Sequence, residues 1–192
     1  MRNAKYSVML IALFSLCHMD GSKAEPPIIM QLQPTASAQD ASGAETDFSA
    51  IGWELLKTDS LGPLRIGLSS DEIVKLLGNP EAKSEAKVWG ADAQEHQQWI
   101  YDKVGLSFDM VTEAGEQRIA MIKASSPCEF NTSRGVGIGT DALTVMRAYK
   151  AEINLSESDT SRSIVAGSVY GGLIFSLQDG RVSSIFLGAS AE

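Results

Sequence analysis

The chain has 192 residues, of which 44% are hydrophobic and 21% are charged, with 16 lysines and arginines against 24 aspartates and glutamates. This composition is ordinary for a globular protein and excludes collagen-like, coiled-coil and wholly disordered chains. The net charge of -8 disfavours nucleic acid and anionic membrane surfaces as partners, because phosphate binding requires a basic face. With 2 histidines and 2 cysteines in the sequence, we predict no metal site and no cofactor.

Residues 1–24 have the pattern of a secretory signal peptide. Arg2 and Lys5 precede an apolar run at 8–17, and Ser22-Lys23-Ala24 offers a small-x-small cleavage site. The apolar run is too short to span a bilayer, which disfavours the alternative of a membrane anchor. A second alternative is a lipid anchor at Cys17, which the bulky neighbour Leu16 disfavours. We therefore expect a periplasmic or secreted protein.

Residues 25–46 are predicted to form a flexible tether. Prolines at 26, 27 and 34 interrupt any helix, and residues 35–45 are rich in serine, alanine and glycine with no apolar period. Such a segment buries too little surface to offset the entropy of ordering it. Ile28-Ile29-Met30 is the exception, because it is apolar enough to pack on the domain or on a partner.

The rest of the chain contains an internal repeat, with a first unit at 47–127 and a second at 128–192. Ile66-Gly67 and the helix pattern at 69–77 align with Ile138-Gly139 and the pattern at 141–149. Gly105-Leu106-Ser107-Phe108 aligns with Gly172-Leu173-Ile174-Phe175, and Arg118-Ile119 with Arg181-Val182. The order of these landmarks is the same in both units, and only the loop lengths differ.

Each unit is predicted to be a short helix packed on one face of a small antiparallel sheet, which gives an α+β fold. Ser69 and Glu72 form a capping box at the start of the first helix, and Asp141 caps the second. Ile73, Leu76 and Leu77 give the first helix its apolar stripe. The strands are expected at 97–102, 105–111, 117–123, 162–170, 172–178 and 181–187.

The last hairpin predicts which side chains face away from the helices. Asp179-Gly180 is typical of a two-residue type I′ turn, so Gln178 should face Arg181 and Phe175 should face Ser184. Strand alternation then divides the hairpin into two faces. The inner face carries Leu173, Phe175, Leu177, Val182 and Phe186, and the open face carries Ile174, Ser176, Gln178, Arg181, Ser183, Ile185 and Leu187. In the first unit the open face carries Ser107, Asp109, Ala120 and Ile122.

The chain resembles the β-lactamase-inhibitor-protein-like family. The resemblance covers residues 62–192 and rests on the segment at 62–69, on Trp99-x-Tyr101, and on the Gly-Leu-x-Phe strand beginning at Gly105. Small outer-membrane-assembly lipoproteins related to this family carry one such unit, and the inhibitors carry two in tandem. The resemblance implies helices on one face of an antiparallel sheet and protein contacts on the other.

No catalytic residue stands out in the sequence. The glycine-rich segment at 135–140 lacks the terminal Gly-Lys-Ser/Thr of a phosphate-binding loop and is better explained as the approach to the second helix. His96 and Cys128 would remain after cleavage of the signal peptide, but nothing near either residue orients the pair for catalysis. Trp99 and Tyr101 are expected in the core, and Trp89 is expected to be exposed.

We therefore expect a non-catalytic protein-binding module, such as an inhibitor of a hydrolase or an immunity factor against one. One alternative is a structural component of bacterial envelope assembly, with the lipid anchor at Cys17. Another is a small-ligand carrier or an enzyme, which needs a pocket that the sequence does not indicate. The acidic charge of the chain favours a basic protein partner. The candidate partner-binding residues lie on the open faces of the two sheets: Ser107, Asp109, Ile174, Ser176, Ser183 and Ile185.

Overall fold

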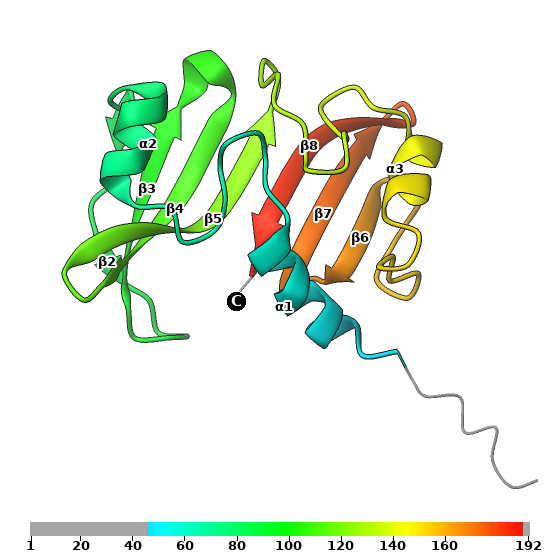
Figure 1. Ribbon diagram of the computed structural model, residues 1–192, viewed down its shortest axis with the longest axis horizontal. Helices are drawn as coiled ribbons and strands as arrows, with labels where there is room; N and C mark the ends of the chain where they lie inside the picture. Colours follow the sequence, from blue (N-terminus) through cyan, green and yellow to red (C-terminus); the bar gives the residue numbers. More distant parts are fainter. Residues whose placement is uncertain (1–45, 190–192) are drawn as a thin grey trace, which may run out of the picture. The chain divides into compact units, whose positions relative to one another are not determined.

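The computed structural model describes residues 46–189, which are coloured by position in the sequence in Figure 1. The predicted signal peptide, Cys17 and nearly all of the predicted tether lie outside these residues, so the expectations for them stay predictions. Among the described residues, no helix is both long enough and apolar enough to cross a lipid bilayer.

The fold is α+β, as the sequence predicts. The helices are α1 (Phe48–Thr58), α2 (Ser70–Leu77) and α3 (Ala142–Ala148), and a short 3₁₀ turn spans Asp102–Val104. Helix α1 and the two-residue strands at the edge of the sheet were not predicted. The strands are β1 (Ala82–Lys83), β2 (Lys87–Val88), β3 (Glu95–Tyr101), β4 (Leu106–Glu113), β5 (Glu116–Ser125), β6 (Ser163–Ser168), β7 (Gly171–Gln178) and β8 (Arg181–Gly188).

All of these strands belong to one antiparallel sheet with the order β1-β3-β4-β5-β8-β7-β6, and β2 also pairs with β3. The meander β3-β4-β5 follows α2, and the meander β6-β7-β8 follows α3. Strands β5 and β8 join the two meanders by pairing residues 121–125 with residues 184–188. A helix with a three-stranded meander after it thus occurs twice along the chain, and in the first half β1 and β2 lie between the two. That the two halves are copies of one unit stays a prediction.

Matching hydrogen bonds tie the loop before each helix to the last strand of its own half. Gly67 N–H donates to the carbonyl of Ile119, and the Arg118 guanidinium donates to the carbonyl of Gly67. In the second half, Gly139 N–H donates to Val182 and the Arg181 guanidinium donates to Gly139. Gly67 and Gly139 have φ values of 81° and 86°, a region that favours glycine. The glycine-rich approach to α3 therefore has a structural role.

The helix caps follow the sequence prediction. Ser69 and Glu72 form the complete capping box at α2, and the Asp141 carboxylate accepts from Thr144 N–H at α3. The predicted stripe of α2 is partly wrong, because Leu76 is 49% exposed. Helix α2 turns Ile73 fully inward and packs Val74 and Leu77 beside it, which directs Leu76 to solvent.

Helix α1 packs on the β6–β7 hairpin through a close backbone contact. A Cβ atom at Gly52 would lie 1.7 Å from the carbonyl oxygen of Gly171, so glycine is required here. Leu55 and Leu56 of the same helix enter the core. Beyond the helix, the buried Asp59 carboxylate accepts from the Tyr149 hydroxyl at 2.7 Å, which links α1 to the residue that ends α3.

The core lies on the side of the sheet that the helices cover (Figure 1). Two rows of buried side chains cross the sheet from β3 to β6, each member pairing with the next across neighbouring strands. Every member is at most 3% exposed, and Trp99 and Tyr101 are in the core as predicted. One row is Trp99, Phe108, Ile122, Leu187, Leu173 and Ala166, and the other is Tyr101, Leu106, Ala124, Ile185, Phe175 and Ile164.

A β-bulge in β8 makes the predicted register of the last hairpin wrong. Gln178 pairs with Arg181 as expected, but Phe175 pairs with Ile185 instead of Ser184, because Ser183 is an extra residue in β8. Past this bulge every side chain of β8 changes face, so Ile185 and Leu187 point inward and Phe186 points outward.

The first half has its bulge at the equivalent place. Asp109 pairs with Met121 and Met110 pairs with Ile119, which leaves Ala120 as the extra residue in β5. Ile122 therefore faces the core and is 1% exposed, contrary to the prediction that it lies on the open face. The two bulges explain the same error in both halves.

We predict that Phe175→Ala lowers the free energy of unfolding by about 3–5 kcal/mol, because the ring is fully buried in the core, where it packs against Tyr149. Ser176→Ala on the opposite face should change it by about 0.5 kcal/mol or less. Urea unfolding followed by circular dichroism measures both. A loss below about 1 kcal/mol for Phe175→Ala would place the ring outside the core.

Candidate functional site

The face of the sheet opposite the helices is called the open face below. It carries most of the candidate residues, but Ile185 lies elsewhere. Ser107, Asp109, Ile174 and Ser176 lie on it as predicted. Ile185 does not, because the bulge turns it into the core, and Phe186 takes its place beside Ile174. Ser183 sits in the bulge itself, where its hydroxyl donates to the carbonyl of Ser176.

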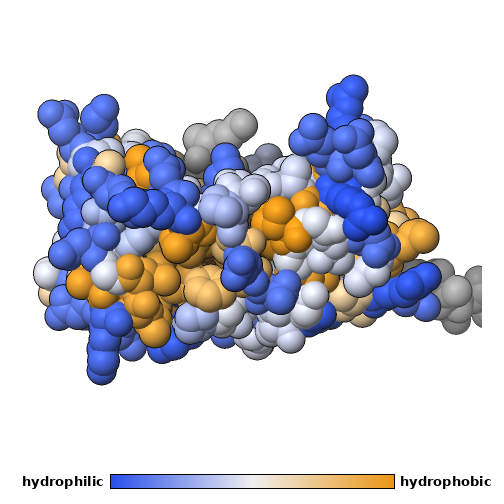
Figure 2. Space-filling view, turned by 90° about the horizontal axis from the view of Figure 1, so that it is seen from above, coloured by the Kyte–Doolittle hydropathy of each residue, from blue (hydrophilic) through white to orange (hydrophobic). Residues whose placement is uncertain are grey.

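Exposed hydrophobic residues alone do not mark a functional surface in this protein. Viewed from above in Figure 2, hydrophobic residues lie in separate patches among hydrophilic ones. Large apolar side chains that are at least 40% exposed occur on α1, α2 and α3, in β2 and in loops. Scattered residues of this kind are normal on folded proteins. They are Trp53, Leu76, Val88, Val104, Leu143, Leu155 and Tyr170.

Two hollows on the open face meet at Asp109 and Gln98, which line both of them. The first has a volume of about 460 Å³ and lies under β2 and the loop that follows it; its other lining residues are Ser84, Glu85, Lys87, Trp89 and His96. The second has a volume of about 430 Å³ and runs across β4, β5, β8 and β7. It is lined also by Ser107, Phe108, Met121, Lys123, Ile174, Ser176, Ser184 and Phe186.

His96 is the centre of a polar cluster in the first hollow, in which His96 and Asp109 are buried and Asp92 is exposed. Its Nδ1 lies 2.5 Å from Oδ2 of Asp109, and its Nε2 lies 2.9 Å from Oδ2 of Asp92. The indole of Trp89 stacks on the imidazole, with ring centroids 3.9 Å apart and planes within 4° of parallel. His96 comes from β3, Asp109 from β4, and the other two side chains from the loop between β2 and β3.

The cluster favours a protonated His96. Burial lowers the pKa of the imidazole, but hydrogen bonds to Asp109 and Asp92 outweigh burial and raise that pKa above its ordinary value of 6.5. The pKa of Asp92 is lowered by the hydrogen bond from Gln94 N–H and then by His96. Burial raises the pKa of Asp109, and the bond from His96 offsets part of this rise. A ring that donates from both nitrogens to carboxylates is an imidazolium.

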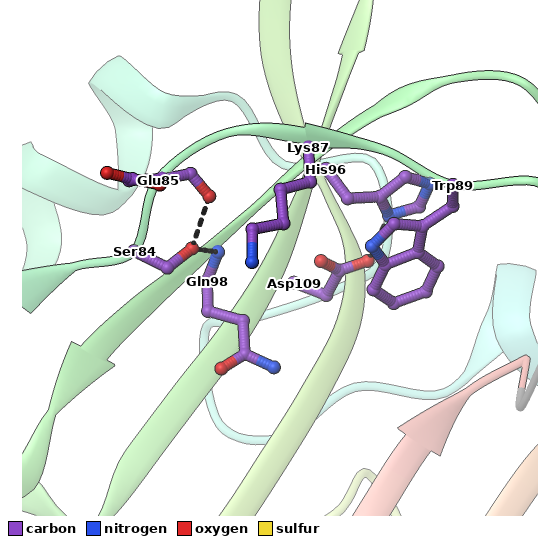
Figure 3. A pocket seen from close by; sticks show the side chains of 7 residues that line it. All are labelled: Ser84, Glu85, Lys87, Trp89, His96, Gln98 and Asp109. Carbon is purple, nitrogen blue, oxygen red and sulfur yellow. Dashed lines mark hydrogen bonds and ion pairs between the residues drawn. The ribbon is translucent and has the colours of Figure 1, made fainter.

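Asp109 has one carboxylate oxygen without a partner. The residue is 5% exposed, and its Oδ1 atom is buried with no hydrogen bond to any described residue. Figure 3 shows one carboxylate oxygen on the side of His96 and the other toward the space beside Lys87 and Gln98. An unsatisfied buried acceptor costs about 1–3 kcal/mol, so this atom is expected to receive a donor from whatever occupies the hollow.

The geometry does not provide a catalytic dyad. A histidine that activates a nucleophile needs one ring nitrogen free to take a proton, and both nitrogens of His96 are bonded to carboxylates. Cys128 lines a different hollow, with Lys103, Val104 and Pro127. Burial raises the pKa of its thiol, which disfavours the reactive thiolate. Among residues 46–189, no group of three or more histidine, cysteine, aspartate or glutamate side chains is placed to hold a metal ion.

The sequence interpretation missed His96, Trp89 and Asp92 as site residues. The sequence did contain one signal for His96. Side chains alternate along a strand, so an inward Trp99 places both Gln98 and His96 on the opposite face. Gln98 pairs with Asp109 on that face. The prediction of an exposed Trp89 is only partly correct, because the indole is half-buried against the imidazole. A loop that folds back on the sheet has no periodic pattern, so its contacts were not predictable.

The chain was compared with family models, curated proteins and solved structures, and none of the three comparisons gave a match.

We predict that the His96 cluster makes the fold less stable at alkaline pH. The raised pKa means that folding favours the protonated ring, so this contribution is fully present below about pH 6.5 and is lost as the pH rises through the pKa in the folded protein. Urea unfolding between about pH 6 and pH 9 should show a larger fall in stability for the wild-type chain than for His96→Gln. The other histidine, His18, is common to both proteins. Equal pH profiles would contradict the protonated cluster.

Proposed function

We propose that this chain is a non-catalytic protein-binding module and that the open face is its binding surface. The observation that carries the proposal is the buried, unpaired Oδ1 of Asp109 at the point where the two hollows meet. A buried acceptor without a partner is costly, and a bound partner that donates to it removes that cost. The open face thus has a specific polar anchor and not only an area of exposed sheet.

The composition of the second hollow also supports a protein interface. Met121, Ile174 and Phe186 are half-buried and give it an apolar centre. Ser107, Ser176 and Ser184 line the same hollow with hydroxyl groups. Lys123, which pairs with Ser107 and Phe186, adds one cationic group. An apolar centre with a polar rim is the usual composition of a protein–protein interface.

The two edges of the sheet are less suited to binding. At one edge, β1 and β2 pair with β3. At the other edge, the segment after α3 folds along β6, where Asn154 N–H donates to Val165 and the Ser158 hydroxyl accepts from Val165 N–H. A covered edge at β6 and edge strands of only two residues at the other end disfavour recognition by addition of a partner strand. The broad face of the sheet is the better candidate.

The absence of catalysis is part of the proposal. Both ring nitrogens of His96 are bonded to carboxylates, and the Cys128 thiol is buried in another hollow, so neither is placed as a base or a nucleophile. We extend the proposal to a periplasmic or secreted inhibitor of a hydrolase, or immunity factor against one. The support is the predicted signal peptide and the resemblance at 62–192, which implies helices on one face of the sheet and protein contacts on the other.

The alternative of an envelope-assembly component rests on Cys17, which lies outside the described residues. No contact among residues 46–189 favours it over the binding module.

The proposed function predicts that Ile174→Asp combined with Phe186→Asp removes partner binding, because two carboxylates replace the apolar centre of the surface. Cross-linking pull-down from envelope extract should recover the partner at least tenfold less than with the wild-type chain. The matched control is Leu76→Asp with Leu143→Asp, which adds the same charge to exposed positions of α2 and α3 on the helical side.

Circular dichroism checks that both double variants fold. If the open-face variant does not fold, Ser107→Glu with Ser176→Glu tests the same surface at more tolerant positions. Undiminished recovery of every partner by a folded open-face variant would overturn the assignment. Loss of the partner only in the helix variant would place the binding surface on the opposite side of the molecule.

A further inference from the structure

The unpaired oxygen of Asp109 restricts the chemistry of its ligand. The atom belongs to a carboxylate, so it can accept hydrogen bonds, and an ionised carboxylate cannot donate them. It has almost no accessible surface, so a ligand group must be narrow and reaches the atom only after a side chain that lines the hollow moves. The nearby carboxamide of Gln98 and carboxylate of Glu85 line the same hollow and add two further groups that can accept hydrogen bonds. The ligand therefore needs several N–H or O–H donors in one small group.

The charge around this atom favours a cation. Protonated His96 lies between the carboxylates of Asp92 and Asp109, so these three side chains together carry an excess negative charge. Hydrogen bonds between ionised groups are roughly twice as strong as neutral ones. The whole chain is also acidic, with a net charge of -8, which favours a basic partner during the encounter.

We infer that the open face carries a guanidinium-binding site, in which an arginine side chain of the protein partner enters the hollow beside Trp89 and donates to Oδ1 of Asp109. A guanidinium presents five N–H donors in a plane, whereas the ammonium of lysine has three and is more strongly hydrated. The indole of Trp89 lines the same hollow, with one face already stacked on the imidazole of His96. The inference rests on the proposed function, because it names the chemistry of the partner at the same surface.

Lys87 provides an internal test of this site. Its ammonium points into the same hollow in Figure 3, yet no ion pair within 4.0 Å joins it to a carboxylate of the described residues. The side chain is exposed, so it can move aside for a ligand. Its positive charge opposes an incoming guanidinium, and its removal should therefore strengthen the binding of arginine. The same removal would weaken the binding of an anion.

The test uses three small probes with the isotopically labelled full chain: the amides of Nα-acetyl-arginine, Nα-acetyl-lysine and Nα-acetyl-citrulline. Citrulline has nearly the shape of arginine without its charge. We expect the arginine probe to bind with a Kd in the millimolar range, as is usual for one side chain. It should shift the NMR signals of Gln98, Asp109 and the Trp89 indole N–H. The lysine probe should bind more weakly, and the citrulline probe should bind at least about tenfold more weakly.

Variants of the chain locate the site. Asp109→Asn should weaken arginine binding by about tenfold or more, because the neutral amide keeps the shape and loses the charge. Asp102→Asn is the matched control at an exposed carboxylate and should leave binding unchanged. Lys87→Gln should strengthen binding a few-fold. If Asp109→Asn does not fold, the comparison of arginine with citrulline on the wild-type chain still tests whether the site requires a charged guanidinium.

Equal binding of arginine and citrulline, or no shift of the open-face signals, would overturn the guanidinium site. That result leaves the proposed function to its own test, since the Ile174→Asp and Phe186→Asp pull-down does not depend on arginine. If a partner no longer binds Asp109→Asn but still binds Asp102→Asn, this result supports both the guanidinium site and the proposed function. Weaker arginine binding by Lys87→Gln would contradict the inference, because it would mean that Lys87 contributes to the site.

Discussion

The pairing of β5 with β8 is the constraint on which the rest of the structure depends. These two strands are the last strands of the two meanders, and their pairing makes a single sheet from β3 to β6. Because a sheet has only two faces, the same pairing fixes which side chains of both halves share a side. Two rows of buried residues can then cross all six of these strands under the helices. The opposite side becomes one continuous face, and both hollows lie on it.

The two β-bulges determine the chemistry of each side. The bulge at Ala120 lets Ile119 and Ile122 both reach the core although they are three residues apart, and the bulge at Ser183 does the same for Val182 and Ile185. The residues paired beside the bulges then face outward. In the first half this outward residue is Asp109 of β4, which is bonded to His96. In the second half it is Ser176 of β7. A bulge therefore lies beside a charged residue in one half and beside a neutral residue in the other.

Much of the fold could be predicted from local patterns. The caps at Ser69 and Asp141 and the turn at Asp179-Gly180 have specific residue requirements, and all three are where the sequence places them. Helix α1 was missed although Asp47 caps it and Ile51 and Leu55 are four residues apart on one side. Strands β1 and β2 have two residues each, which is too short for any periodic pattern.

The candidate site was harder to predict, because it depends on register and on a folded loop. An apolar spacing of three within a strand, as in Ile119 and Ile122, cannot face one side without an extra residue, so it indicates a bulge. The alternation rule was applied without this correction, and Ile185 was placed on the wrong face. The contacts of Trp89 and Asp92 with His96 come from a loop that turns back onto the sheet. Only the three-dimensional structure brings these residues together.

The most direct test of this account is the chemical accessibility of the two faces. The single variants Ser107→Cys and Ser176→Cys each place a thiol on the open face. Ala124→Cys and Ala166→Cys each place one in the rows of core residues. The buried Cys128 is an internal reference. Maleimide labelling of the folded chain is read at each position by peptide mass spectrometry. The account predicts rapid labelling of the open-face thiols, while the core thiols and Cys128 react only after unfolding. Protection of the open-face thiols to the same degree as Ala124→Cys would show that another segment or a second copy covers this face, and would contradict its role as a free binding surface.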